Sequence, residues 1–481
     1  MEPTLPTVDT RPHAAAWPAR LPHALVVPQT TLWFNLEVSA RRYPDKPAYI
    51  FLGRTLSYAE LHRQATALAG WLQARGVQRG DRVLLFMQNC PQFVVAFYAV
   101  QRADAVVVPV NPMNRADEFG HYITDPGARV ALTTADLAGV VAEANARLPA
   151  PQRLQHIVAT RLAEAMPDTL DPQEAPSAAL LAWLLADPAL PAGATRWADA
   201  LSADHLPGPP QARPDDLALL PYTSGTTGLP KGCMHTHRTL MPNVVGGGLW
   251  GHASAEAVSL GVVPMFHITG MMYGVLGSVY LGSTVVVLPR WDRELAGRLI
   301  SRYRVSHWTC IPTMIIDLFG SPNYQSFDLS SLRYLSGGGA AMPHAVAERL
   351  QKEFGLTFAE GYGLTETAAP SHANPPERAK LQCLGIPLFG TDSRIVDPVT
   401  LQELPQGEVG EIVTHGPMVF KGYWGHEEAT RAAFITLDGK PFFRTGDLGR
   451  VDEEGYFFIT DRLKRMINAS GFKVWPSEVE L

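Results

Sequence analysis

The sequence predicts an α/β protein whose main part has two doubly wound lobes followed by a strand-rich region. Three observations lead to this fold class. Unbroken apolar runs alternate with helical patterns over residues 48–134, the same alternation resumes at residue 217, and short strands divided by turn residues take over beyond about residue 385. Apolar strands separated by helices are typical of a parallel sheet that helices cover on both faces.

The first lobe is expected over about residues 30–215. Its predicted strands are the apolar runs at 48–51, 83–86, 105–108 and 130–132. A helix is expected to begin at the S-x-x-E capping box Ser57–Glu60 and to end at Gly76, and another begins near Pro91. Residues 150–215 are rich in Pro, Ala, Asp and Leu with patchy periodicity, which indicates an extended excursion that joins the two lobes.

The second lobe is expected over about residues 216–384. Its predicted strands are 217–220, 285–288 and 305–310, each followed by a helical pattern. The strand-rich part is expected over about residues 385–463, where Asp397-Pro398, Asp438-Gly439 and Glu454-Gly455 are turn signals typical of hairpins.

Composition narrows the function classes. The 481 residues include 40 Lys+Arg and 46 Asp+Glu, a formal net charge of −6. Nucleic acid is therefore not an expected partner, because a general nucleic-acid binder needs a basic surface. The four cysteines form no C-x-x-C pair, which argues against a zinc site or a disulfide framework and favours a cytoplasmic location. The N-terminus lacks a secretory signal pattern.

One stretch requires a test for membrane insertion. Residues 258–289 contain no Asp, Glu, Lys or Arg, but several glycines, Pro264 and His267 interrupt them. A spanning helix needs about 20 predominantly apolar residues in a row. We therefore expect a strand, a loop, a buried helix and a strand, and no transmembrane segment. Peripheral contact with a membrane and a homodimer are both compatible with the sequence.

The strongest chemical signal is the loop of residues 222–232, which follows a strand and precedes a helical pattern. Its small and hydroxyl residues let a backbone approach an anion closely and offer donors to it. These residues are Thr223, Ser224, Gly225, Thr226, Thr227 and Gly228. Lys231 is the only lysine between residues 47 and 351, which favours a point-charge role at a phosphate over an ordinary surface loop. The spacing is not that of a Walker A loop.

A second glycine motif is not expected to bind a nucleotide. Residues 246–251 satisfy G-x-G-x-x-G, but they lie in or after a helix, whereas a dinucleotide fingerprint follows a strand. A G-x-S-x-G nucleophile elbow is missing from the sequence, which disfavours a hydrolase.

Four further segments combine glycine with polar residues. They are Ser336–Ala341, Glu360–Glu366, Phe443–Asp447 and Asp461–Glu480. Each alone would be a turn. Together with the loop at 222–232, and in this order, they make the sequence resemble the adenylate-forming (AMP-binding) superfamily of acyl-CoA synthetases, peptide-synthetase adenylation domains and luciferases. The resemblance extends from Pro44 to the last residue, and bacterial fatty-acid–CoA ligases are the most similar group.

The resemblance implies a set of nucleotide-binding residues. Thr223 to Gly232 would hold the phosphates of ATP, with Lys231 near the β and γ groups. Tyr362 would lie beside adenine, flanked by the backbone of Gly338, Gly339 and Ala340, and the same motif supplies Glu360, Gly361 and Gly363. Asp447 would bind the ribose hydroxyls, assisted by Arg462. This role suits a carboxylate, since one carboxylate can accept hydrogen bonds from both hydroxyls of a diol.

The resemblance also implies the catalytic and metal-binding residues. Thr365 would hydrogen-bond the α-phosphate and Glu366 would hold Mg²⁺, a metal that needs only one or two protein carboxylates when phosphates bind it too. Lys231 would act on the phosphates, and His267 would lie at the carboxylate site. A core histidine is the plainer interpretation of His267.

A further domain is implied at the end of the chain. In this resemblance the N-terminal domain covers 1–463 with a distorted barrel as its strand-rich part, and 464–481 is a hinge and the start of a small α+β C-terminal domain whose remainder is absent. That domain would rotate about Lys464, bring Gly471 to the channel for the thiol, and supply a lysine that lies beyond residue 481. We therefore expect adenylation and thioester formation by this chain to be weak.

The implied reaction joins a carboxylic acid to coenzyme A at the expense of ATP, releasing AMP and pyrophosphate. Residues 266–272 carry no acidic residue to pair a substrate ammonium, so an amino acid is disfavoured. Apolar residues follow, namely Met271, Met272, Tyr273, Val275 and Leu276. A medium- or long-chain fatty acid is expected. An aryl acid, a carrier-protein-loading domain and a nucleotide-binding relative without turnover stay open as alternatives.

Overall fold

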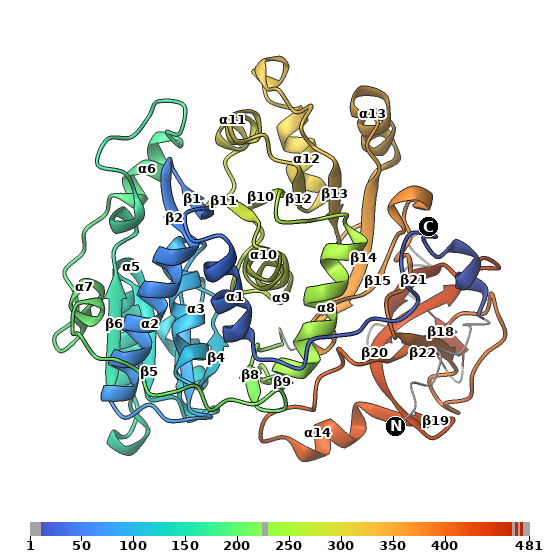
Figure 1. The fold of residues 1–481 in the computed structure, drawn as a ribbon. Helices are drawn as coiled ribbons and strands as arrows, with labels where there is room; N and C mark the ends of the chain where they lie inside the picture. Colours follow the sequence, from blue (N-terminus) through green and yellow to red (C-terminus); the bar gives the residue numbers. More distant parts are fainter. Residues whose placement is uncertain (1–10, 224–228, 464–466, 470–471, 475–481) are drawn as a thin grey trace.

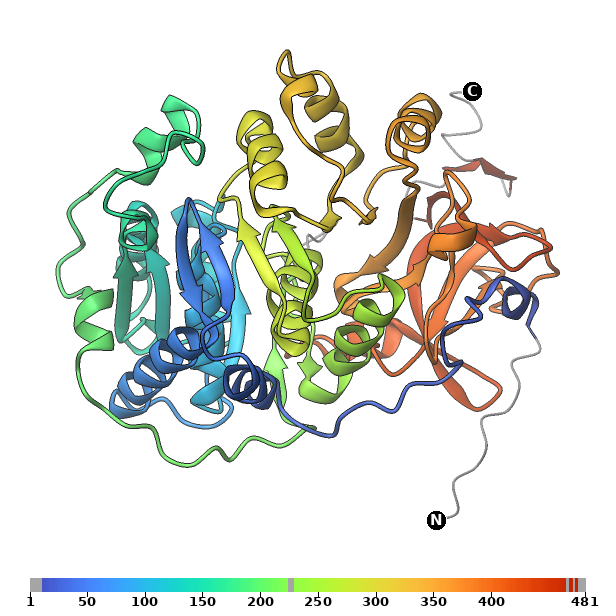
Figure 2. The ribbon, with the colours of Figure 1, turned by 45° about the horizontal axis from the view of Figure 1, so that its top comes forward.

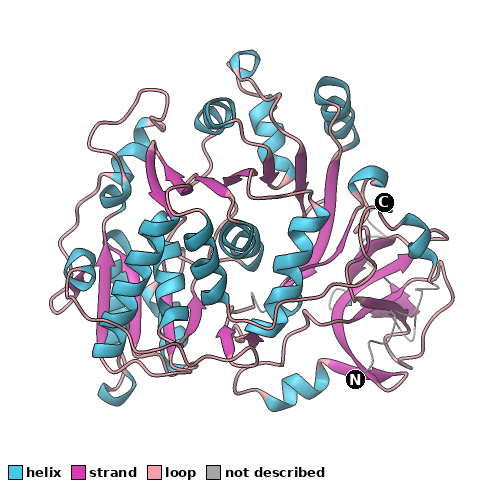
Figure 3. Cartoon of the chain, viewed as in Figure 1, coloured by secondary structure: helices cyan, strands magenta, loops and turns pink. Residues whose placement is uncertain are grey.

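The computed structural model describes residues 11–223, 229–463, 467–469 and 472–474. Figure 1 shows three parts side by side: a sheet with helices, a second sheet with helices, and a strand-rich part at the right of the view. Figure 3 separates them by secondary structure, since helices flank the first two parts and strands dominate the third.

Seven strands of the described ranges form the first sheet, in the order β7-β6-β5-β3-β4-β8-β9. Their bounds are β3 (Arg82–Phe86), β4 (Val106–Pro109), β5 (Val130–Thr134), β6 (His156–Thr160), β7 (Thr195–Arg196), β8 (Leu217–Leu219) and β9 (His235–Thr236). All neighbours run parallel except β8 and β9, which pair antiparallel. The helices after these strands are α3 (Pro91–Arg102), α4 (Ala116–Thr124), α5 (Ala135–Arg147), α6 (Ala178–Leu184) and α7 (Trp197–Leu201).

The second sheet has nine strands within the described residues, in the order β16-β15-β14-β13-β12-β10-β11-β1-β2. Their bounds are β1 (Pro47–Phe51), β2 (Arg54–Ser57), β10 (Val258–Gly261), β11 (Thr284–Val287), β12 (His307–Thr309), β13 (Tyr334–Gly337), β14 (Phe358–Leu364), β15 (Ala369–Ala373) and β16 (Ile386–Pro387). The neighbours from β14 to β1 run parallel, and the two ends of the sheet are antiparallel.

A shared layer of helices lies between the two sheets. It contains α1 (Leu32–Arg42), α2 (Tyr58–Ala74), α3, α8 (His237–Trp250) and α10 (Gly277–Leu281). Neighbouring helices of this layer are in contact in the order α3, α2, α1, α10 and α8. Alternate strand residues divide between two cores: Val83 and Leu85 face this layer, whereas Leu84 and Phe86 pack with α4 and α5 on the outer face. The outer face of the second sheet carries α11 (Arg293–Tyr303), α12 (Pro312–Phe319) and α13 (His344–Phe354) (Figure 1).

The strand-rich part is a curled antiparallel sheet. Its strands are β17 (Asp392–Val396), β18 (Gly410–His415), β19 (Phe434–Leu437), β20 (Lys440–Val451) and β21 (Phe457–Arg462), with α14 (Glu427–Ala432) before β19. β22 (Ile467–Ala469) and β23 (Phe472–Val474) form a separate hairpin. This part and the two parallel sheets agree with the predicted fold class.

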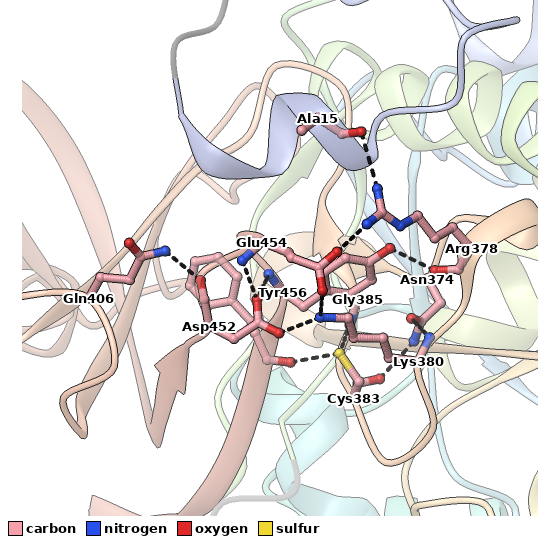
Figure 4. A network of polar contacts seen from close by, with 11 residues as sticks. Ala15, Asn374, Arg378, Lys380, Cys383, Gly385, Gln406, Asp452, Glu454 and Tyr456 are labelled. Carbon is pink, nitrogen blue, oxygen red and sulfur yellow. Dashed lines mark hydrogen bonds and ion pairs between the residues drawn. The ribbon is translucent and has the colours of Figure 1, made fainter.

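The N-terminal segment and a polar network join the strand-rich part to the second sheet. The short helix η1 (Pro12–Ala16) lies against β16, and the chain then runs across the molecule to α1 (Figure 2). Lys380 forms ion pairs with Asp452 at 2.5 Å and with Glu454 at 2.8 Å, and the Tyr456 hydroxyl donates to the Arg378 carbonyl at 2.6 Å (Figure 4). The hairpin between β20 and β21 is therefore fixed against the segment that follows β15.

Several sequence expectations need correction. The run at 48–51, assigned to the first lobe, is β1 of the second sheet, and the run at 217–220, assigned to the second lobe, forms β8 of the first sheet. The excursion predicted at residues 150–215 contains a full strand of the first sheet, β6, because a short apolar run stands between proline-rich flanks. The capping box at Ser57 is only half formed: Ser57 accepts the Glu60 N–H at 3.2 Å, whereas the Glu60 carboxylate pairs with Arg63.

Two expectations agree with the structure. Helix α2 ends at Ala74, and Gly76 follows with a φ of +87°. Residues 258–289 form strand, helical segments and strand, as predicted. Within the described ranges, every helix is too short or too polar to cross a lipid bilayer.

Candidate active site

The two stems of the predicted phosphate loop are joined to each other at the end of β8. Tyr222 and Gly232 form an antiparallel bridge, and the Thr223 N–H donates to the Lys231 carbonyl at 3.0 Å. The Tyr222 hydroxyl donates to Asp125 at 2.6 Å, which ties the stem to α4 and its C-cap. Ser224, Gly225, Thr226, Thr227 and Gly228 lie outside the described residues.

Lys231 and Glu366 share one neighbour, Tyr423. The Lys231 Nζ lies 5.3 Å from the centroid of the Tyr423 ring, and the Tyr423 hydroxyl donates to Glu366 Oε1 at 2.7 Å. Glu366 is 9% exposed, and burial raises the pKa of its carboxyl, against the effects of the Tyr423 hydrogen bond and the Lys231 charge. The predicted lysine and the predicted metal ligand therefore lie in one cluster.

Tyr423 is a site residue that the sequence did not reveal. Its position is fixed by backbone pairing, because Cys233 and Tyr423 form an antiparallel bridge and the Trp424 N–H donates to the Gly232 carbonyl at 2.8 Å. The segment before α14 thus pairs with the described stem that follows Lys231. The only signal in the sequence is the pair of aromatic residues Tyr423 and Trp424 after Gly422. Aromatic residues are common in ordinary strands, so this pair does not indicate a site.

The predicted adenine slot is made by close backbone contacts after β13 and along β14. A Cβ added to Gly338 would lie 2.4 Å from the Gly361 carbonyl oxygen, and one added to Gly363 would lie 1.7 Å from the Ala369 carbonyl oxygen. Larger residues would force the strands apart, so these glycines are required by packing. Gly339, with a φ of +83°, turns the chain into the loop that carries Ala340.

Glu360 supports this loop from behind. Its Oε1 accepts the Gln382 N–H at 2.8 Å and the Met342 N–H at 3.3 Å. The carboxyl is buried, and burial raises its pKa. Glu360 therefore acts as a positioning residue: its hydrogen bond to the Met342 N–H holds the end of the 338–342 segment.

Asp447 lies where the second sheet meets the strand-rich part. Its Oδ2 accepts the Tyr362 hydroxyl at 2.6 Å, and its Oδ1 pairs with Arg462 Nε at 3.1 Å. Asp447 is 1% exposed, and burial raises its pKa, against the effects of Tyr362 and Arg462. Three predicted nucleotide-binding residues from β14, β20 and β21 are therefore in contact.

Thr365 is positioned by a buried histidine. The His235 Nε2 donates to the Thr365 carbonyl at 2.8 Å, and its Nδ1 lies 3.2 Å from Thr239 Oγ1. His267 is exposed and caps α9 (Ile268–Met271), where its Nδ1 accepts the Thr269 N–H at 3.3 Å. It is therefore not the buried core histidine of the plainer interpretation. Gly471 lies outside the described residues, as does the predicted hinge at Lys464.

An apolar cavity of about 70 Å³ lies between α8, β10 and the helical segments after His267. Met272 and Tyr273 line it, whereas Met271, Val275 and Leu276 are buried in the core beside it. Asn243 reaches the cavity from α8 and donates to the carbonyls of Thr367 and Ala368 at 3.1 and 2.9 Å. This end of the cavity thus lies near the chain segment that follows Glu366.

The glycines of the G-x-G-x-x-G motif at 246–251 belong to this cavity. They lie in α8 and at its end, as expected, and Gly247, Gly248 and Gly251 line the cavity wall. Side chains there would fill the space, because a Cβ on Gly248 would lie 3.1 Å from Leu281 Cδ2. The motif therefore shapes a cavity and has no fingerprint geometry.

Buried histidines predict a loss of stability in acid. Burial lowers the pKa of His235 to about 4, of His237 to about 4 and of His372 to about 3. In the unfolded chain these histidines have the ordinary histidine pKa of ~6.5. Below that pH the unfolded chain binds more protons than the folded chain, so the free energy of unfolding falls as the pH drops from ~6.5 toward 4. Each histidine contributes at most ~1.4 kcal/mol per pH unit to the free energy of unfolding.

Urea unfolding at pH 7, 6 and 5 measures this slope. His237→Gln should lower the slope by at most ~1.4 kcal/mol per pH unit, since it removes one group that takes up a proton on unfolding. His344→Gln, on the exposed surface of α13, is the matched control and should leave the slope as it is. An unchanged slope in His237→Gln would contradict the assignment.

Comparison with known proteins agrees with this geometry. The model of the family "AMP-binding enzyme" matches residues 36–424, so the chain belongs to that family. The chain is 34% identical over 479 residues to the long-chain-fatty-acid–CoA ligase of Bacillus subtilis (strain 168), covering 98% of this chain and 83% of the relative. It is 36% identical over 446 residues to a feruloyl-CoA synthase of Amycolatopsis sp, covering 92% of this chain and 80% of the relative.

A solved structure is similar over the same length. The fatty acyl CoA synthetase of Mycobacterium tuberculosis superposes with a TM-score of 0.78 at 28% identity, over 94% of this chain and 82% of that one. The predicted superfamily and fold class are confirmed. The protein is an AMP-forming acid–CoA ligase, which uses ATP, Mg²⁺ and coenzyme A.

Proposed function

We propose that this protein activates a medium- or long-chain fatty acid to an acyl-adenylate and then to an acyl-CoA. The observation that carries the proposal is the apolar cavity that Asn243 links to the segment after Glu366; its lining within the described residues includes no Asp, Glu, Lys or Arg. A hydrocarbon chain gains free energy on entering such a space. An amino acid is disfavoured because its buried ammonium would have no carboxylate partner there.

The first step would be attack of the carboxylate on the α-phosphorus of ATP. A carboxylate oxygen forms the new bond to phosphorus, the bond from phosphorus to the bridging oxygen of the β-phosphate breaks, and pyrophosphate leaves with the electron pair. Such a transfer needs positioning and charge stabilisation rather than covalent help. Lys231 would supply charge at the phosphates, and Thr365 would donate a hydrogen bond to the α-phosphate.

Asp447 and Tyr362 would fix the nucleoside half during this step. The Asp447 carboxylate would bind the ribose, because a carboxylate can accept hydrogen bonds from a diol. Its contacts with Tyr362 and Arg462 orient it before the nucleotide arrives, so little order has to be created on binding.

Glu366 fits a magnesium ligand. One of its oxygens accepts the Tyr423 hydroxyl, which leaves the other for a cation. Among the described residues there is no group of three or more His, Cys, Asp or Glu that could hold a metal by itself. A single carboxylate suits Mg²⁺, because phosphate oxygens and water complete its shell. The bound ion would neutralise phosphate charge.

In the second step the thiol of coenzyme A would attack the acyl carbon. The sulfur–carbon bond forms, the bond from the acyl carbon to the phosphate oxygen breaks, and AMP leaves with that oxygen while the thiol proton passes to solvent. A cytoplasmic location is part of the proposal and is supported by four buried cysteines that form no disulfide.

An aryl acid is the second candidate substrate. It is favoured by the similarity to a feruloyl-CoA synthase and by Tyr273 in the cavity wall, which could stack against an aromatic ring. Pyrophosphate exchange with octanoate, decanoate, palmitate, ferulate and phenylalanine separates the candidates. Exchange is expected with the fatty acids. Exchange with ferulate or phenylalanine alone would overturn the proposal, and ATP binding without exchange for any acid would favour a non-enzymatic relative.

A further inference from the structure

The apolar cavity is separated from a second, polar cavity by a thin wall. The second cavity has a volume of about 590 Å³ and is lined by charged and hydroxyl side chains, among them Arg304, Arg333, Glu256 and Glu377. Three residues line both cavities: Gly251, His307 and Tyr334. We call these three residues the floor, because they border the apolar cavity on one side and the polar cavity on the other.

The floor stands at the end of the strands that is remote from the nucleotide site. His307 is the first residue of β12 and Tyr334 the first residue of β13, and the two are paired in register. Ser259, near the start of β10, is paired with His307. The glycine motifs predicted to bind the nucleotide lie at the opposite, carboxyl ends of β13 and β14, as is usual for ligand sites of parallel sheets. The cavity therefore runs along β10 from the nucleotide site to the floor.

Hydrogen bonds and ring packing make the floor rigid. The His307 Nε2 donates to the Gly251 carbonyl at 3.0 Å, and its Nδ1 lies 2.8 Å from Ser306 Oγ. The Tyr334 ring packs against the imidazole with centroids 6.0 Å apart. A Cβ on Gly251 would lie 3.0 Å from Tyr334 Cε1, so the three residues are in close contact. Burial lowers the pKa of His307, against the effect of its hydrogen bond to the Gly251 carbonyl.

We infer that His307 and Tyr334, held against Gly251, set the longest acyl chain that the enzyme accepts. This inference rests on the proposed function. The cavity wall follows β10 and the two residues after it, from Ser259 to Val263, a distance of at most about 13 Å at ~3.3 Å per residue. An extended chain advances about 1.2 Å per bond, since three main-chain bonds span at most ~3.6 Å, so about ten or eleven bonds fit.

Carbon atoms beyond that length would meet the floor. Each methylene buried in the apolar cavity should raise kcat/KM by up to about fourfold until the floor is reached. Longer chains would have to displace Tyr334 and enter the polar cavity, where apolar burial is not available. The chain-length profile should therefore rise to decanoate or dodecanoate and then fall.

The test is the ratio of kcat/KM for palmitate to that for decanoate in floor variants. Tyr334→Val opens the floor and keeps a residue suited to a strand, so the ratio should rise at least tenfold, and His307→Ala should raise it less. Gly251→Ala pushes a methyl group toward Tyr334 and should shift the optimum to shorter chains. Arg333→Ala, which lines only the polar cavity, is the matched control and should keep the wild-type profile.

The outcomes separate this inference from the proposed function. If the wild-type protein activates no fatty acid of any length, the proposed function fails. If it activates fatty acids but Tyr334→Val and Gly251→Ala both keep the wild-type optimum, the inference about the floor fails alone. Circular dichroism and thermal unfolding identify any variant that does not fold, and the opposite shifts expected from the two variants keep the test informative when one is lost.

Discussion

Glu366→Gln should slow pyrophosphate exchange by a hundredfold or more at millimolar Mg²⁺. The substitution removes the one carboxylate that the described site offers to a metal on the phosphates, and charge at that position acts directly on the transferring group. Tyr423→Phe removes only the hydroxyl that bonds Glu366 Oε1, so a smaller loss of about tenfold is expected, as is typical of groups that orient a ligand.

A magnesium titration distinguishes these losses from damage to the fold. The Tyr423→Phe variant should recover rate at raised Mg²⁺, whereas Glu366→Gln should recover little. Glu174→Gln is a close control, because Glu174 is also buried and accepts a tyrosine hydroxyl, that of Tyr303 at 2.5 Å, far from the site. If Glu174→Gln and Glu366→Gln had the same effect on the magnesium response, the metal assignment would be wrong.

Asp447→Asn should weaken ATP binding by about thirtyfold or more. Hydrogen bonds to a charged group contribute roughly 1.5–3 kcal/mol each, and the amide loses the charge and one acceptor. The binding constant for ATP, measured by calorimetry, gives the effect without turnover. Asp438→Asn removes an exposed aspartate that also pairs with an arginine, Arg394, and it should leave ATP binding unchanged.

Nucleotide analogues test whether Asp447 contacts the ribose itself. The wild-type protein should bind 2′-deoxy-ATP or 3′-deoxy-ATP more weakly than ATP, and Asp447→Asn should discriminate much less between these nucleotides, because the two changes remove the same contact. If the wild-type protein and Asp447→Asn discriminated equally between these nucleotides, Asp447 would not contact the ribose and would be only a structural partner of Arg462.

Local patterns predicted much of the fold and supplied the residues of the candidate site. Strands β1, β3, β4, β5 and β11 appeared as unbroken apolar runs, and the glycine-rich segments marked loops at strand ends. The phosphate loop could be recognised because its lysine stands alone in a long lysine-free stretch. Gly338 and Gly363 are needed where backbones approach closely, so motif and packing point to the same residues there.

Contacts between distant segments could not be predicted in this way. Tyr362 and Asp447 are 85 residues apart and meet only because the strand-rich part folds against β14. β1 and β2 come first in the chain, yet they complete the second sheet beside β11, whereas β8 and β9 return to the first sheet. Tyr423 reaches the site through its pairing with Cys233, and the glycines of α8 line the cavity because α8 packs beside β10. Contacts of this kind leave no periodic pattern in the sequence.

The most direct test of adenylation measures whether an oxygen of the acid's carboxylate is transferred to AMP. Decanoate labelled with ¹⁸O in both carboxylate oxygens is incubated with the protein, ATP, Mg²⁺ and coenzyme A, and AMP is analysed by mass spectrometry. Attack of the carboxylate on the α-phosphorus predicts that AMP carries one ¹⁸O and that the acyl-CoA keeps the other. Unlabelled AMP, or ADP as the nucleotide product, would contradict adenylation at this site.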